Sequence, residues 1–100
     1  MREPRQLSDL DSVGPSMLRD FERLGIRSVA ALARRNPKSL YEELCRATGQ
    51  AQDLCVLDVF TAAVAQARNR RLPAPQCQWW YWSRKRKAEE RKLRVQRAGR

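Results

Sequence analysis

The segment from Asp11 to Ser16 contains residue types that suit a phosphate contact. Gly14 can adopt the positive φ that other residues avoid, and Pro15 fits the first position of a following helix. The first N–H groups of a helix have no acceptor within it, and the positive end of the helix dipole favours an anion. This turn and the helix after it therefore predict a site for a phosphate group.

The same segment resembles a helix-hairpin-helix element, in which a Gly-apolar-Gly turn leads into a helix with apolar positions facing back. Ser12-Val13-Gly14 stands at the turn, and residues 17–21 supply the helix. The resemblance implies contacts with the DNA backbone and weak sequence preference. Ser12 departs from the pattern's first glycine, and Asp11 would repel a phosphate, which Arg19 would offset. The candidate contacts are Ser12, Val13, Gly14, Ser16 and Arg19. The alternative is that Gly14-Pro15 is only a tight turn between helices.

The positive charge of the chain is concentrated in its last third. The formal net charge is +10, yet residues 1–67 carry nine basic and nine acidic side chains, whereas residues 68–100 carry twelve basic and two acidic ones. A neutral domain followed by a dense, Arg-rich segment is typical of proteins that bind polyanions. The alternative is a solvated tail that only aids solubility. We add four candidate phosphate contacts from this segment: Arg84, Lys85, Arg86 and Lys87.

Helix start and stop signals predict an all-α fold with five helices and no strands. Ser28 and Asn36 are typical helix N-caps, and Gly25 and Gly49 are typical residues after a helix end. We expect a short helix at residues 7–10 and further helices at residues 15–24, 29–33, 37–48 and about 52–70.

The fifth of these helices is expected to be central, because it is the most apolar. Its predicted buried stripe consists of Leu54, Leu57, Phe60, Val64 and Ala67. Three polar residues, Asp53, Asp58 and Gln66, are expected to lie off that stripe.

Composition divides the chain into three parts. Residues 1–72 form the expected helix-hairpin-helix domain, residues 73–83 an extended Pro- and Trp-rich segment that packs on it, and residues 84–100 a basic segment expected to be disordered. The rings of Trp79-Trp80-Tyr81-Trp82 either stack on unpaired bases or cover the small core. We expect at least two of them to pack, leaving Tyr81 and one Trp available.

Several stretches carry a wider resemblance to a known family: Gly14-Pro15-Ser16 through Leu24-Gly25-Ile26-Arg27-Ser28, Leu40-Tyr41-Glu42-Glu43-Leu44-Cys45, Gly49 to Cys55 with Asp53, Val56 to Phe60, and Trp79-Trp80-Tyr81-Trp82. Over roughly residues 7–83 the chain resembles small bacterial helix-hairpin-helix proteins of the pathogenicity locus type, also labelled mitomycin-resistance proteins. The first half is also similar to the C-terminal domain of TfoX-type competence regulators. The resemblance implies an all-helical fold and DNA binding, without a defined biochemical role.

Composition argues against an enzyme. The chain has no His, so the commonest general base is absent. It has 100 residues, so little volume remains for a substrate pocket once the helices pack. We expect no catalytic residue, no cofactor and no small-molecule substrate. Cys45, Cys55 and Cys77 are odd in number and lack metal-ligand spacing, which favours buried thiols in a cytoplasmic protein over a redox pair or a metal site. We expect no signal peptide and no membrane span.

These observations favour a DNA-binding module that tolerates many sequences and holds the phosphate backbone through the hairpin and the basic segment. Two alternatives remain open. The fold also suits a protein-interaction adaptor, since function does not follow from fold, and the basic segment with its rings also suits RNA.

Overall fold

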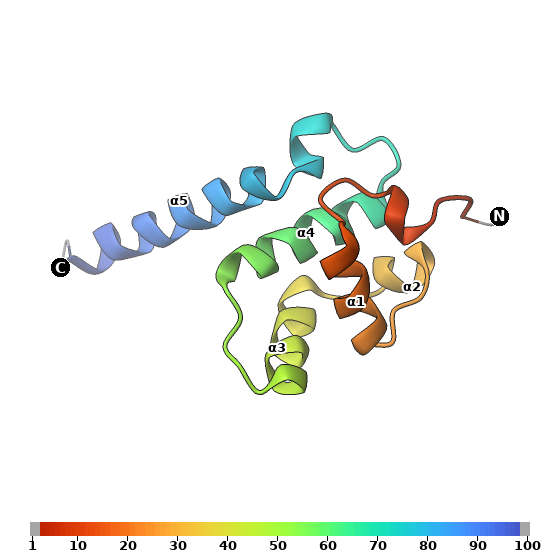
Figure 1. The fold of residues 1–100 in the computed structure, drawn as a ribbon. Helices are drawn as coiled ribbons and strands as arrows, with labels where there is room; N and C mark the ends of the chain where they lie inside the picture. The colour runs from red at the N-terminus through yellow and green to blue at the C-terminus, as the bar shows by residue number, and fades with distance from the viewer. Residues whose placement is uncertain (1–2, 99–100) are drawn as a thin grey trace.

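The computed structural model describes residues 3–98 and is all-α there, as predicted, with no strand among these residues. Figure 1 shows a cluster of short helices from which one long helix projects. The elements are a 3-10 turn η1 (Leu7–Asp9), α1 (Pro15–Arg23), α2 (Val29–Ala33), α3 (Pro37–Thr48), α4 (Leu54–Arg68), a second 3-10 turn η2 (Ala74–Cys77) and α5 (Trp79–Ala98).

The predicted helix caps are confirmed. The side chain of Ser28 accepts a hydrogen bond from the N–H of Ala31, and Asn36 accepts from the N–H groups of Lys38 and Ser39. Gly25 and Gly49 adopt φ values of 75° and 66°, a left-handed conformation that costs glycine little. Local sequence therefore sets where α2 and α3 begin and where α1 and α3 end.

A single hydrophobic core lies between α1, α2, α3 and α4. The rings of Phe21 and Phe60 pack with their centroids 5.7 Å apart. Other fully buried residues of this core are Val29, Leu32, Leu40, Leu44, Ala63 and Val64. α4 contacts α2, α3, α5 and η2, so the expectation that this helix is central is confirmed.

The predicted buried stripe of α4 is correct only in its second half. Phe60, Val64 and Ala67 are buried, whereas Leu54 is 44% exposed. Two residues expected off the stripe are buried instead: Asp58 is 2% exposed and Gln66 is 5% exposed. The reason is that α5 and η2 cover a second side of α4, so burial no longer follows a single stripe.

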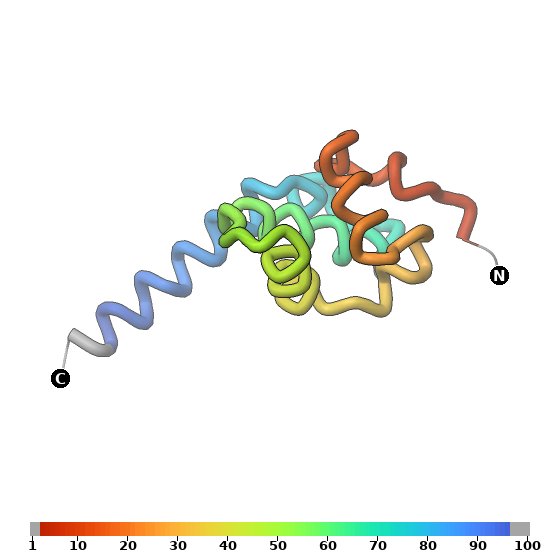
Figure 2. The backbone as a smooth tube through the Cα atoms, turned by 60° about the horizontal axis from the view of Figure 1, so that its bottom comes forward, coloured from red at the N-terminus to blue at the C-terminus, as the bar shows by residue number. Residues whose placement is uncertain are grey.

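The end of the chain differs from the expected extended segment and disordered tail. Residues 74–77 form η2, and α5 continues without interruption from Trp79 to Ala98. Arg86 bonds Asp58 of α4 and also Glu90 one turn further along α5, which fixes the first half of the helix. Beyond this point α5 leaves the domain in both views (Figures 1 and 2). Residues 99 and 100 of the expected tail lie outside the described part of the chain.

Candidate nucleic-acid interface

The turn of residues 10–14, which leads into α1, has its unusual backbone at Ser12 rather than at Gly14. Ser12 has a φ of 68°, whereas Gly14 has a φ of −100° and a ψ of −175°, which is extended backbone. The expected positive φ at Gly14 is therefore wrong. Ser12 occupies the left-handed position that the first glycine of the pattern would fill, and Gly14 serves as the N-cap residue of α1.

A buried amide fixes this turn to the rest of the domain. The N–H of Asp11 donates to Oε1 of Gln66 at 2.8 Å, and Nε2 of Gln66 donates back to the carbonyl of Asp11 at 2.9 Å. The same Nε2 lies 3.3 Å from the carbonyl of Cys77 in η2. One side chain of α4 thus holds both the 10–14 turn and η2. Its sequence signal is a lone amide between Val64 and Ala67 in the most apolar helix.

The hydroxyl of Ser12 joins the 10–14 turn to the start of α5. It donates to the carbonyl of Cys77 and accepts from the N–H of Trp79, both at 3.2 Å. Because its one proton is already used, this hydroxyl does not donate to a phosphate in this arrangement. The predicted phosphate contact of Ser12 is therefore left to its backbone N–H.

Among α1 to α4 in the described residues, α1 is the helix whose N-terminus carries no side-chain cap. Side chains cap α2, α3 and α4, through Ser28, Asn36 and Asp53. Within the described residues, no side chain caps α1 at Gly14. A Cβ placed on Gly14 would meet no described atom within 4 Å, so the space around this N-cap residue is open. This is the arrangement that an incoming phosphate oxygen requires.

The remaining residues predicted in this region divide between surface and core. Gly14, Ser16 and Arg19 are exposed along the first turns of α1, so a ligand can reach all three. Val13 is half-buried and packs against the hydrophobic core, so it positions the turn more than it offers a contact. Asp11 is exposed within the turn, and its negative charge repels an anion.

Arg86 has a different role from the one that the sequence suggested. Its Nε and Nη2 donate to the two carboxylate oxygens of Asp58, each at 3.0 Å, and its Nη1 lies 3.2 Å from Glu90. The hydrogen bonds to Asp58 raise the pKa of the Arg86 guanidinium above its usual range, so this guanidinium stays charged. Arg86 is 19% exposed and anchors α5 to α4, which makes it a poor candidate for phosphate.

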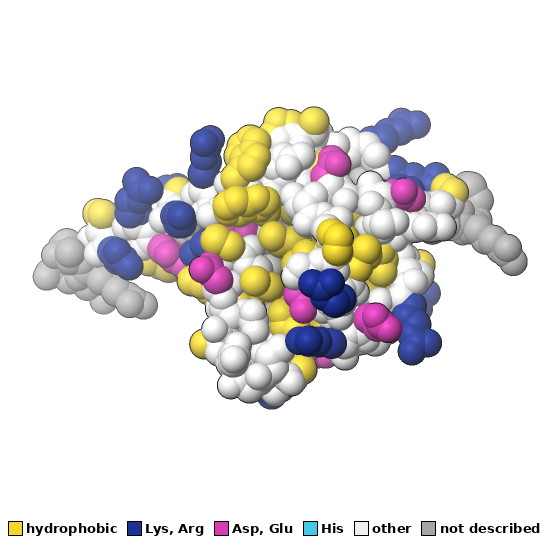
Figure 3. Space-filling view, in the orientation of Figure 1, with side chains coloured by type: hydrophobic (Ala, Val, Ile, Leu, Met, Phe, Trp, Pro, Cys, Tyr) yellow, Lys and Arg dark blue, Asp and Glu magenta, His cyan; other side chains and the backbone are white. Residues whose placement is uncertain are grey.

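The other three predicted cations of α5 are exposed. Arg84, Lys85 and Lys87 are accessible to solvent, and Figure 3 shows Lys and Arg side chains distributed along this helix. The Arg84 guanidinium lies 5.1 Å from the ring centroid of Trp80, and the Lys85 ammonium lies 5.5 Å from that of Trp82. These cations therefore lie against aromatic faces and remain open to an anion.

The four aromatic residues before these cations are helical and only partly buried. Tyr81 and Trp82 are half-buried, and the Trp82 Nε1 donates to the carbonyl of Gln76 at 2.7 Å. Trp79 and Trp80 are exposed. The prediction that at least two rings pack agrees with this arrangement; Tyr81, expected to stay available, is half-buried, and Trp79 and Trp80 are more exposed.

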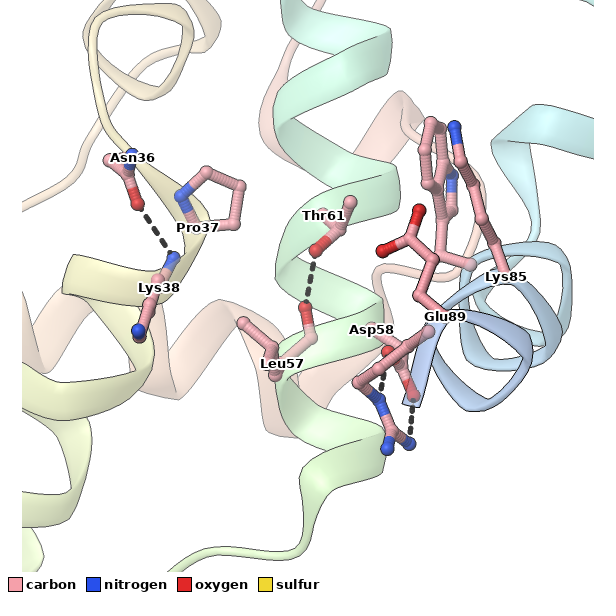
Figure 4. A pocket seen from close by; sticks show the side chains of 10 residues that line it. Asn36, Pro37, Lys38, Leu57, Asp58, Thr61, Lys85 and Glu89 are labelled. Carbon is pink, nitrogen blue, oxygen red and sulfur yellow. Dashed lines mark hydrogen bonds and ion pairs between the residues drawn. The ribbon is translucent and has the colours of Figure 1, made fainter. Parts of the chain in front are cut away.

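A groove of about 360 Å³ runs between the N-terminus of α3, the middle of α4 and the first half of α5. The Asp58–Arg86 pair lines it, and Figure 4 shows Lys85 and Glu89 on the α5 side and Asn36 and Lys38 on the α3 side. The charges around the groove are mixed, and the side chain of Asn36 already accepts from the N–H groups at the start of α3. The start of α3 in this groove is therefore capped, unlike the start of α1 at Gly14.

The three cysteines are free and half-buried, and no disulfide joins them in the described structure. A hydrogen bond with Asp53, together with burial, raises the pKa of Cys55, and burial raises the pKa of Cys77. Since the thiolate is the reactive form, raised pKa values make both thiols slow to react. Within the described residues, no three His, Cys, Asp or Glu side chains lie close enough together to hold a metal ion.

We expect Cys55 and Cys77 to react with iodoacetamide more slowly than a small-molecule thiol does at about pH 8. The measurement is a time course of peptide mass spectrometry on the folded chain, and the urea-unfolded chain is the control, in which both rates should rise. Rapid labelling of either cysteine in the folded chain would contradict this and favour a redox role.

Comparison with known sequences decides the family. The sequence profile of the pathogenicity locus family matches residues 1–88. This chain belongs to that family. Within the family it is 44% identical over 81 residues to the protein named mitomycin resistance protein McrB of Streptomyces lavendulae, a match that covers 81% of this chain and 73% of that protein. No solved structure matches it. The family resemblance predicted from the sequence is thus confirmed.

The match to the family covers the 10–14 turn, the whole helical domain and the start of α5 up to residue 88. It therefore includes Arg84, Lys85, Arg86 and Lys87, which the sequence analysis had placed in the part beyond the resemblance. Among the helices of the described residues, none combines the length and apolar character needed to cross a membrane.

Proposed function

We propose that this member of the pathogenicity locus family is a non-enzymatic DNA-binding protein that holds the phosphate backbone and tolerates many sequences. In this proposal the 10–14 turn and α1 act as a helix-hairpin-helix element, and the exposed cations of α5 bind backbone nearby. The observation that carries the proposal is the start of α1. Its N-cap residue is the exposed Gly14, which has open space around it. An uncapped helix start of this kind suits a phosphate oxygen.

The arrangement of α5 supports the same proposal. The Ser12 hydroxyl connects the 10–14 turn to the N–H of Trp79, so the exposed cations that follow on α5 begin within two helical turns of that connection. One ligand with regularly spaced negative charges can therefore contact both regions. Backbone contacts of this kind carry no base information, which is why we expect weak sequence preference. We place the protein in the cytoplasm, where free cysteines remain reduced.

The test of the proposal is Gly14→Val. Valine tolerates the extended backbone of Gly14, and its Cβ meets no described atom, so the variant should fold normally. Its side chain would stand between the N–H groups of α1 and the phosphate, and we expect duplex affinity to fall about tenfold, as for one lost charge-assisted hydrogen bond. The measurement is fluorescence anisotropy with labelled duplexes of two unrelated sequences.

The control is Ala47→Val, which places the same valine side chain at an exposed position near the end of α3, far from the 10–14 turn in Figure 1. We expect it to bind DNA like the unaltered chain. If Gly14→Val binds duplex DNA as tightly as the control, the 10–14 turn does not hold phosphate. If the unaltered chain binds no duplex at all, the domain is better assigned to a protein partner.

A further inference from the structure

Two adjacent tryptophans at the start of α5 are left outside the core. Trp79 is 39% exposed and Trp80 is 40% exposed. Figure 3 shows hydrophobic side chains gathered on the surface over the first part of α5. The neighbouring Tyr81 and Trp82 are half-buried and pack edge to face, with centroids 5.1 Å apart. The domain thus uses Tyr81 and Trp82 for packing and leaves the surface of Trp79 and Trp80, the Trp79–Trp80 patch, open.

The surroundings of this patch are cationic. Arg84, one helical turn after Trp80, places its guanidinium 5.1 Å from the Trp80 ring centroid, and the exposed Lys85 and Lys87 follow. Aromatic rings beside arginine are the combination with which proteins hold unpaired bases, since the ring stacks on the base and the cation attracts the phosphate. An acidic nucleic acid strand complements this patch in charge and in aromatic character.

The patch also adjoins the place where we propose that duplex DNA is held. The N–H of Trp79 donates to the Ser12 hydroxyl at 3.2 Å, and Ser12 is two residues before Gly14. A strand whose phosphate lies at the start of α1 therefore reaches the two rings within a short length of backbone. Duplex bases are stacked on one another and cannot use the rings, whereas bases just beyond the end of a duplex can.

We propose that the Trp79–Trp80 patch stacks unpaired bases next to a duplex held at the 10–14 turn, so that the preferred ligand is DNA at a junction between double and single strand. This inference rests on the proposed DNA-binding function and adds the class of DNA. Arg84 keeps the Trp80 ring in place and contacts the phosphate of the stacked nucleotide.

The test compares three labelled DNA ligands by fluorescence anisotropy at one salt concentration. They are a blunt duplex, the same duplex with a single-stranded extension at one end, and the extension strand alone. We expect the full chain to bind the extended duplex about tenfold more tightly than the blunt one, the gain expected from one or two stacked bases. The tryptophan fluorescence should be quenched by the extended duplex and much less by the blunt one.

In the double variant Trp79→Ala/Trp80→Ala we expect the two duplexes to bind equally, with the affinity for the blunt duplex unchanged. Leu93→Ala is the matched control, because Leu93 is an exposed apolar residue on the same helix, and it should keep the preference. Circular dichroism checks that each variant retains its helices.

The outcomes separate the two proposals. If the chain binds the blunt duplex but gains nothing from the extension, the junction inference is overturned and the proposed function stands. If the extension strand alone binds as tightly as the extended duplex, the duplex is not part of the preferred ligand and the inference is also overturned. If no ligand binds, the proposed function fails; self-association that disappears in the double variant would then assign the patch to a protein contact.

Discussion

Arg86→Ala is expected to lower the free energy of unfolding by about 3 kcal/mol, which corresponds to roughly 15 °C in melting temperature for a chain of this size. The reason is the environment of its partner. Asp58 is 2% exposed, and Arg86 supplies both of the hydrogen bonds that its carboxylate oxygens receive from α5. Without the guanidinium, a charged carboxylate remains buried between α4 and α5. Thermal and urea unfolding followed by circular dichroism measure the loss.

Lys87→Ala is the control, because it removes the same charge from the next residue of α5, which is exposed. We expect it to change stability by less than about 0.5 kcal/mol. A loss below about 1 kcal/mol in Arg86→Ala would contradict the argument, since that is the range of exposed ion pairs.

A second variant distinguishes anchoring from DNA contact. Replacing both partners, Asp58→Leu with Arg86→Met, removes the buried charges together and should recover most of the stability, as apolar replacement of buried ion pairs does elsewhere. The double variant has the same net charge as the unaltered chain. If Arg86 only anchors α5, its DNA affinity should also match. A clear loss of DNA affinity in this well-folded variant would indicate that Arg86 does contact phosphate.

The parts of the fold that were predictable depend on neighbours in the sequence. Ser28 and Asn36 cap helices by bonding N–H groups two or three residues away, and Gly25 and Gly49 relieve local backbone strain. Such interactions are complete within one turn of the chain. They therefore identify α1 to α4 without any knowledge of the tertiary structure.

The wrong predictions depend on partners far along the chain. Gln66 bonds Asp11, and Asp58 bonds Arg86, across 55 and 28 residues respectively. Helical periodicity predicts one apolar stripe, but α5 covers α4 on a second side. The polar residues of α4 on that side are therefore buried. The positive φ at Ser12 likewise depends on Cys77 and Trp79, which accept from and donate to its hydroxyl.

For the candidate site, Gly14, Ser16 and Arg19 are exposed at the start of α1, and their contact with a phosphate stays a prediction. Within the basic run, composition alone could not show which cation faces α4. Helical spacing identifies that cation: Trp82 and Arg86 are four residues apart, so they share the face of α5 that packs on the domain.

Replacing Arg84, Lys85 and Lys87 together by glutamine is expected to weaken binding of a blunt duplex about a hundredfold at low salt. All three are exposed, and none is recorded in an ion pair within the described residues. Each phosphate contact releases about one counterion, so the slope of log affinity against log salt should become shallower by about three. Anisotropy titrations over a series of salt concentrations give both quantities.

The control for this triple variant is Arg23→Gln with Arg34→Gln and Arg46→Gln. These three arginines are exposed on the domain, and replacing them removes the same total charge. If binding reflects only net charge, both triple variants lose affinity and slope equally, and the α5 site is refuted. If α5 lies on the phosphate backbone, only the first variant has a shallower slope of log affinity against log salt, because counterions are released by the phosphates in direct contact. Charges farther than about 10 Å from the DNA contribute little, since their attraction is screened at 0.1 M salt. Leaving Arg86 in place in both variants keeps α5 docked on α4, so a difference between them reports on DNA contact and not on the loss of the helix.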